Sequence, residues 1–153
     1  MNTELLFDVP RIPIEWESGG KTFGFQVRGI SDEDLVSLMR DHREQLVRAF
    51  DTIQGAEERD LESAKDFGVE LLQEVPELVA QLIALAADKP DGAPVIRKMP
   101  APIKLKALME IWQLTVVDTG GFEPFLTQVI SVMQGLSAGM TNLKDSMQET
   151  LTV

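Results

Sequence analysis

Hydrophobic and polar residues alternate near the start of the chain, over residues 12–28. The alternation is interrupted by Gly19-Gly20, and two glycines supply the positive φ angles that a tight two-residue turn requires. This pattern predicts a β-hairpin with one apolar face, which must pack on helices or on another subunit because a lone hairpin is marginal in water. The apolar face comprises Ile12, Ile14, Trp16, Phe23, Phe25 and Val27.

From Ser31 onward the hydrophobic period lengthens to three or four residues, the spacing of an amphipathic helix. Ser31 is a good N-cap, and the acidic run Asp32–Asp34 suits the positive end of the helix dipole. The Pro, Gly and Asp content of residues 88–94 predicts a loop. We therefore predict a mainly α fold (α+β), in which an N-terminal β-hairpin precedes a bundle of about five helices. The expected helices span about residues 31–53, 58–75, 76–87, 102–117 and 123–136.

The distribution of polar and proline residues divides the chain into three expected parts. Residues 1–11, which end in Pro10 and Arg11, are expected to form a flexible arm. Residues 12–136 are expected to form a single helical domain with the N-terminal β-hairpin. Residues 137–153 are expected to form a polar C-terminal tail, because one apolar residue per turn is too few to hold a helix without a partner.

The chain is strongly acidic and contains no cysteine, with a formal net charge of −11 over 153 residues. Such a surface repels nucleic-acid backbones and anionic membranes. Disulfides, thiolate nucleophiles and cysteine zinc sites are excluded. The N-terminus has no basic region typical of a signal peptide, and no apolar run approaches the ~20 residues of a spanning helix. We expect a cytoplasmic protein that binds neither nucleic acid nor membrane.

No catalytic constellation is present in the sequence. His42 is the only histidine, and it lies on an apolar helix stripe, where we interpret it as a structural residue. A Ser-His-Asp triad would need it as the base, and no Gly-x-Ser-x-Gly motif accompanies it. Neither Gly19-Gly20 nor Gly120-Gly121 belongs to the full pattern of a further Gly, a Lys and a Ser/Thr that a phosphate-binding loop needs. We expect no enzyme activity, no cofactor and no metal.

Residues 99–133 combine two apolar helices, a Gly120-Gly121 turn and three of the nine aromatic residues in the chain. Methionine side chains suit adaptable binding surfaces, and recognition of a partner helix needs an apolar groove. Two interpretations stay open for the aromatic residues, which are either ordinary core or part of a protein-binding surface. The candidate protein-binding residues are Trp112, Phe122, Phe125, Met133 and Met140.

Three stretches of the sequence carry a resemblance to a known family: FGFQVRGISDEDL (residues 23–35), VPELVA (residues 75–80) and LTVVDTGGF (residues 114–122). Together they resemble the tail assembly chaperones, or pre-tape-measure proteins, of bacteriophages with long, non-contractile tails. The resemblance covers residues 12–136 and lies in the order of elements and in short phrases. It implies no individual binding residue.

The resemblance implies a non-enzymatic protein that keeps the tape measure protein soluble and recruits tail tube protein during tail assembly. It also implies a mostly α-helical fold, a homo-oligomer, a location in the cytoplasm of the bacterial host and absence from the mature virion. The alternative is an acidic regulatory or adaptor protein that binds one folded protein partner. The position of the gene separates these functions, because a chaperone gene is expected just upstream of a very long tape measure gene.

Overall fold

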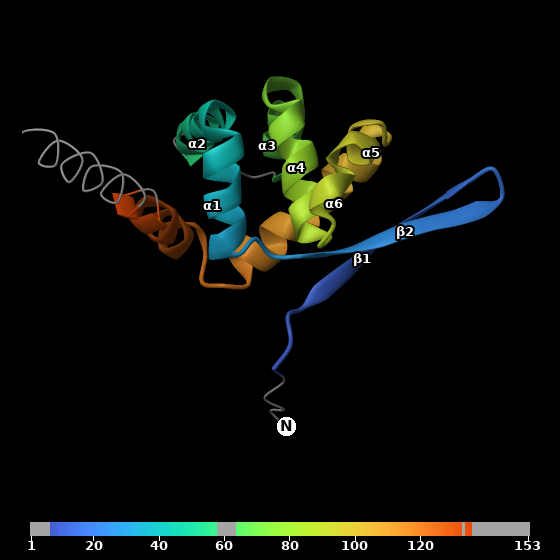
Figure 1. Cartoon of the computed structure of the whole chain (residues 1–153), viewed down its shortest axis with the longest axis horizontal. Helices are drawn as coiled ribbons and strands as arrows, with labels where there is room; N and C mark the ends of the chain where they lie inside the picture. The colour runs from blue at the N-terminus through green and yellow to red at the C-terminus, as the bar shows by residue number, and fades with distance from the viewer. Residues whose placement is uncertain (1–6, 58–63, 133, 136–153) are drawn as a thin grey trace, which may run out of the picture.

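The computed structural model describes residues 7–57, 64–132 and 134–135 (Figure 1). It is mainly α with an N-terminal two-stranded hairpin, which confirms the predicted fold class. The elements are β1 (Arg11–Ser18), β2 (Lys21–Arg28), α1 (Asp32–Asp41), α2 (Arg43–Glu57), α3 (Ala64–Glu74), α4 (Pro76–Ala86), η1 (Pro90–Gly92), α5 (Ala93–Arg97), α6 (Ala101–Trp112), the π-helical turn η2 (Gln113–Val117) and a further helical segment at residues 122–132.

The hairpin has the predicted two-glycine turn and the predicted apolar face. Ile14 pairs with Phe25, and both turn glycines have positive φ (60° at Gly19 and 78° at Gly20). Ile14 and Val27 are fully buried against the helices, whereas the side chain of Phe23 near the turn is 44% exposed. The half of the hairpin next to the helices is therefore part of the core, and the other half projects beyond them (Figure 1).

Helix α4, whose sequence is apolar at nearly every position, occupies the centre of the domain. It contacts α1, α3, α5, α6 and β2. Pro76 stands in the first turn, where a missing backbone N–H leaves no intrahelical hydrogen bond unmade. Ile83, Ala84 and Ala86 are completely buried, and their small or branched side chains let the neighbouring helices approach closely.

The single helix predicted over residues 31–53 is wrong, because the chain breaks at His42 into α1 and α2. His42 caps α1 with non-helical backbone angles (φ −137°, ψ 41°), and its N–H donates to the carbonyl of Leu38. The break changes the chain direction, so that α1 packs on α4 while α2 packs mainly on α3. Neither proline nor glycine marks this position, which explains why periodicity alone predicted a continuous helix.

The predicted loop at residues 88–94 is also partly helical. Pro90 opens the short 3-10 helix η1, and Pro94 lies in the first turn of α5. Proline is compatible with the first turn of a helix, so these prolines begin short helices here. The buried side chain of Ile96 anchors α5 in the core.

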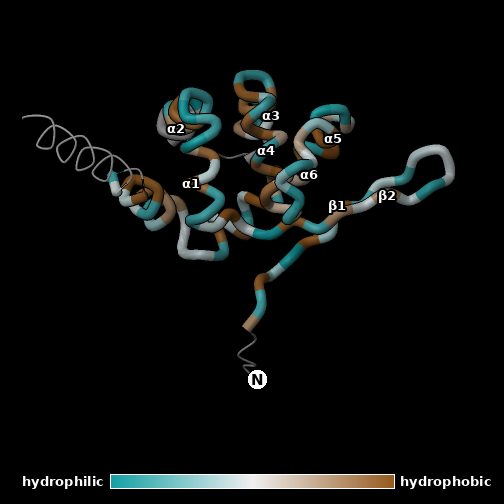
Figure 2. Tube along the Cα trace, in the orientation of Figure 1, coloured by the Kyte–Doolittle hydropathy of each residue, from teal (hydrophilic) through white to brown (hydrophobic). Residues whose placement is uncertain are grey.

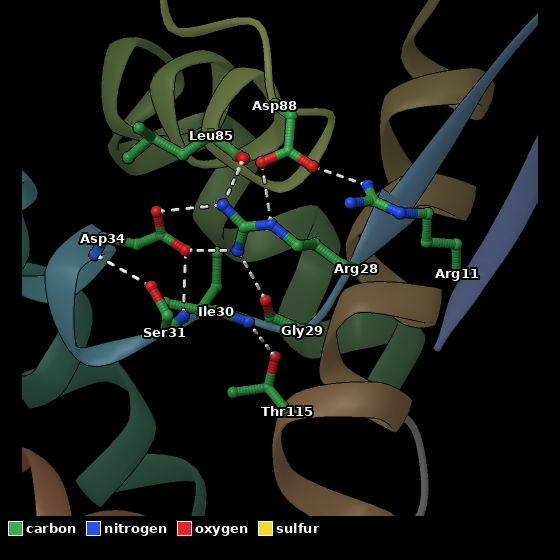
Figure 3. Close-up of polar contacts among 9 residues, drawn as sticks. All are labelled: Arg11, Arg28, Gly29, Ile30, Ser31, Asp34, Leu85, Asp88 and Thr115. Atoms are coloured by element: carbon green, nitrogen blue, oxygen red, sulfur yellow. Dashed lines mark hydrogen bonds and ion pairs between the residues drawn. The ribbon is translucent and has the colours of Figure 1, made fainter. Parts of the chain in front are cut away.

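Arg28, at the end of β2, joins the hairpin to two helices (Figure 3). Its guanidinium donates to Asp34 of α1 (Nη1–Oδ2 2.5 Å) and to Asp88 after α4 (Nε–Oδ1 2.9 Å). It also donates to the carbonyl of Leu85 (3.0 Å). The Asp88 carboxylate also accepts a hydrogen bond from a second cation, Arg11 of β1 (Nη1–Oδ2 2.5 Å). These bonds fix both strands against the helices.

Asp34 and Ser31 form a reciprocal cap at the start of α1. The Ser31 hydroxyl accepts from the N–H of Asp34 (3.2 Å), and the Asp34 carboxylate accepts from the N–H of Ser31 (2.9 Å). The predicted N-cap is confirmed. Asp34 has a further role that the sequence did not predict, because its side chain is only 7% exposed and pairs with Arg28.

Ionisation of Asp34 is favoured by its partners. Burial by itself raises the pKa of the carboxyl, but the hydrogen bonds from Arg28 and from the Ser31 backbone outweigh it, and the pKa lies below its ordinary value. The pKa of Asp88 is lowered by its hydrogen bond from Arg11, against a smaller opposing effect of burial and with further help from Arg28. The same acidic partners raise the pKa of Arg28, which stays charged.

We predict that Arg28→Met lowers the free energy of unfolding by about 3–5 kcal/mol, because it leaves the Asp34 carboxylate buried without its cation. Arg97→Met is the matched control, since the Arg97–Glu77 pair is half exposed on both sides and should contribute less than about 1 kcal/mol. Urea denaturation measures both. Equal losses in the two variants would contradict a special role for Arg28.

We also predict an acid-sensitive stability. Because the folded-state pKa of Asp34 is lowered, its contribution is fully present above the ordinary aspartate pKa of about 4 and is lost as the pH falls through the folded-state value. Asp34→Asn should therefore flatten the decline of the urea midpoint below about pH 4. A decline as steep as that of the wild type would show that other carboxylates cause it.

Candidate functional site

An apolar pocket lies between α1, α2, α3, α4 and α6, with a volume of about 110 Å³. Its inner wall is core, including Leu38 and Ile111, which are almost completely buried. Figure 2 shows hydrophobic positions (brown) recurring along the helices of this region. An apolar cavity of this kind excludes water and accepts a small hydrophobic group. The arrangement can hold one apolar side chain of a partner.

Aromatic side chains form one end of the pocket. The Trp112 ring lies 5.5 Å from that of Phe67, 6.2 Å from Phe122 and 6.3 Å from Phe125, measured between ring centroids. Phe67 is buried, whereas the other three are half-buried. Trp112, Phe67 and Phe125 line the pocket directly, and Phe122 stacks on Trp112. We call these four residues the aromatic rim.

The turn after η2 brings the last described helix onto the rim. Gly120 and Gly121 have φ angles of 115° and 101°, which side chains rarely allow. The N–H of Gly121 donates to the carbonyl of Val116 (2.9 Å) and closes the turn. The chain then reverses, and Phe122 and Phe125 reach Trp112 from the other side.

The structure thus brings together three of the five predicted binding residues. Trp112, Phe122 and Phe125 form one cluster, and Met133 and Met140 lie outside the residues whose side chains are described. The half-exposure of the three aromatic residues is intermediate between a core and an open surface. Their role in binding a partner stays a prediction.

The pocket also joins the three stretches that carry the family resemblance. The N–H of Ile30 donates to the Thr115 hydroxyl (3.0 Å), and a Cβ on Gly29 would lie 3.2 Å from the Leu114 carbonyl oxygen. Glycine therefore permits the close approach of the β2–α1 link to η2. Sequence reasoning did not predict this juxtaposition, because no local pattern relates residues so far apart. The stretches contribute Ile30, Leu35, Val75, Leu78, Val79, Thr115 and Val116 to the lining.

Polar chemistry is sparse around the pocket. Within the described residues, no cluster of three or more His, Cys, Asp or Glu side chains is placed to hold a metal ion, and no buried side-chain nitrogen or oxygen lacks a hydrogen-bond partner. His42 is half-buried at the α1–α2 break. None of the helices within the described residues has the length and hydropathy needed to cross a bilayer. The site offers hydrophobic contact.

Comparison with known proteins agrees with the resemblance found in the sequence. A family model described as "Pre-tape measure protein" matches residues 6–150. Searches of curated proteins and of solved structures found no match. The family takes part in bacteriophage tail assembly. Because the match covers nearly the whole length, including the hairpin and the pocket, this chain belongs to the pre-tape measure protein family.

Proposed function

We propose that this protein is a non-enzymatic tail assembly chaperone that keeps the tape measure protein soluble and recruits tail tube protein. The observation that carries the proposal is the apolar pocket with its half-buried aromatic rim in a member of this family. The proposed place of action is the cytoplasm of the bacterial host, and the protein is not expected in the mature virion.

The pocket suits an amphipathic helix of the client. One apolar side chain would enter the pocket, and its neighbours at helical spacing would pack on Trp112, Phe122 and Phe125. Each fully buried large apolar side chain contributes about 1.5–3 kcal/mol. The site therefore favours sequences with recurring large apolar residues, which is the property that makes an unassembled chain aggregate.

The acidic surface supports the same function. With a net charge of −11, separate complexes of this protein repel one another, which opposes their non-specific aggregation. A client bound in the pocket would be part of a complex that carries this negative charge. We also propose that the protein forms a homo-oligomer, which would present several client sites and a binding surface for tail tube protein.

Filling the pocket tests its role without removing any contact. Ala49 is buried on α2 and lines the pocket, so Ala49→Leu extends a side chain into it. We predict that the variant melts at or above the wild-type temperature, because filling a cavity commonly adds about 0.5–2 kcal/mol. Co-expressed tape measure protein should shift to the insoluble fraction, since the pocket is no longer free.

The control is Ala101→Leu, an equal enlargement at an exposed position at the start of α6. It should keep the client soluble. A client that stays soluble with a well-folded Ala49→Leu variant would show that the pocket is only a packing defect of the core.

Truncation of the aromatic rim provides a second test. We predict that Trp112→Ala and Phe122→Ala reduce the soluble fraction of co-expressed tape measure protein, while both variants of the chaperone stay folded. Their melting temperatures should fall by less than full burial would cause, because these rings are half-buried and a core aromatic truncation costs about 3–5 kcal/mol. Ile130→Ala, at a 41% exposed position of the same helical segment as Phe122, should change neither. Normal melting together with normal client solubility in both rim variants would exclude the rim as the client surface.

A further inference from the structure

A second apolar groove, of about 660 Å³, lies under the projecting half of the hairpin. Trp16, Phe23 and Phe25 form one wall, and Val95 and Met99 belong to the opposite wall between α4 and α6. Trp16 stacks on Phe23 with ring centroids 5.7 Å apart and meets Phe25 edge-on at 6.1 Å. Phe23 is 44% exposed and Val95 is 64% exposed, so a partner can reach both walls.

The groove is basic on an acidic protein. The charged residues that line it are Lys89 and Lys98, whereas the chain as a whole has a net charge of −11. Asp88, beside Lys89, is bonded to Arg11 and Arg28. An apolar segment that carries acidic residues therefore complements the groove in both hydrophobicity and charge.

The N-terminal arm of this same chain has that composition. Residues 4–9 read ELLFDV, with apolar residues between Glu4 and Asp8. Phe7 is fully exposed and Val9 is 50% exposed. Hydrophobic residues (brown) alternate with polar ones along the described part of the arm (Figure 2). An exposed run of this kind is typical of a segment that is buried by a partner.

The direction of the arm leads it away from the aromatic end of the groove of its own subunit. The arm enters β1 at Arg11, and the described residues before Arg11 lead away from the hairpin (Figure 1). The groove extends from Lys89, beside the Asp88 that binds Arg11, to its aromatic wall near Trp16 and Ser18 at the other end of β1. Phe7 is four residues from Arg11, a span of about 14 Å, while Trp16 is five residues along the strand in the opposite direction, about 17 Å away.

We propose that the N-terminal arm of one copy binds the hairpin groove of a second copy. Phe7 and its apolar neighbours pack between the hairpin aromatics and α5, and Asp8 lies near Lys89 or Lys98. This inference rests on the homo-oligomer in the proposed function and names its interface. Because the arm and the groove are different surfaces, the contact is heterologous, and repeated contacts build a ring or an extended chain.

Sedimentation velocity of the full-length protein at micromolar concentrations, without tape measure protein, tests the interface. Phe7→Ser removes the central apolar side chain of the arm, and Val95→Glu places a negative charge in the groove. Both positions are exposed, so both variants should fold normally. Val47→Glu, at an exposed position on α2 outside the groove, is the control.

We expect the wild type and Val47→Glu to form oligomers and each of the two interface variants to sediment as a monomer. An equimolar mixture of Phe7→Ser and Val95→Glu should form a 1:1 dimer, because the first retains an intact groove and the second an intact arm. The proposal would be overturned by a monomeric wild type or by interface variants that assemble normally. It would also be overturned by a mixture that stays monomeric, which is the result expected if each arm folds onto its own groove. Client solubility is measured separately, so failure here leaves the chaperone function open to its own test.

Discussion

The ion pair of Arg28 with Asp34 is the interaction on which the arrangement of the whole domain depends. A two-stranded hairpin has little stability alone, and here Arg28 ties it to the helices by donating hydrogen bonds to Asp34, Asp88 and the Leu85 carbonyl. Burying the Asp34 charge is costly, and the cost is offset because no buried side-chain nitrogen or oxygen among the described residues lacks a hydrogen-bond partner. The same carboxylate caps α1, so the orientation of the hairpin and the start of the helical bundle are set together.

The position of Arg28 affects both apolar sites, which are the pocket between the helices and the groove under the hairpin. The two residues that follow Arg28 are Gly29 and Ile30. They lie against Leu114 and Thr115 and close one side of the pocket. The strands before Arg28 extend in the other direction and form a wall of the groove. The pocket is the proposed client site, and the groove is the proposed contact with a neighbouring copy. Their separation would allow a subunit to hold a client while it is bound to other subunits.

Local sequence patterns predicted the elements whose stability is mainly local. The hairpin followed from alternation and two glycines, the start of α1 from Ser31, and the start of α4 from Pro76. The spacing of Ser31 and Asp34 is also a capping-box signal. Nothing local predicted that Asp34 would meet Arg28 and that Arg28 would meet Asp88, because ion pairs between separate elements depend on how those elements pack. The break at His42 was missed for the same reason, since a continuous helix would satisfy the local periodicity equally well.

By itself, the sequence determined the mainly α class with its hairpin, the acidic surface and the family, because these properties depend on composition, short-range periodicity and short phrases of residues. It also singled out Trp112, Phe122 and Phe125 as candidate binding residues, a role that stays a prediction. Only the tertiary structure decided that these rings border a pocket, that this pocket unites three distant stretches, and that the hairpin overhangs a basic groove. Such features arise where elements distant in sequence meet, and the free energy that selects their packing comes from the burial of shared surface.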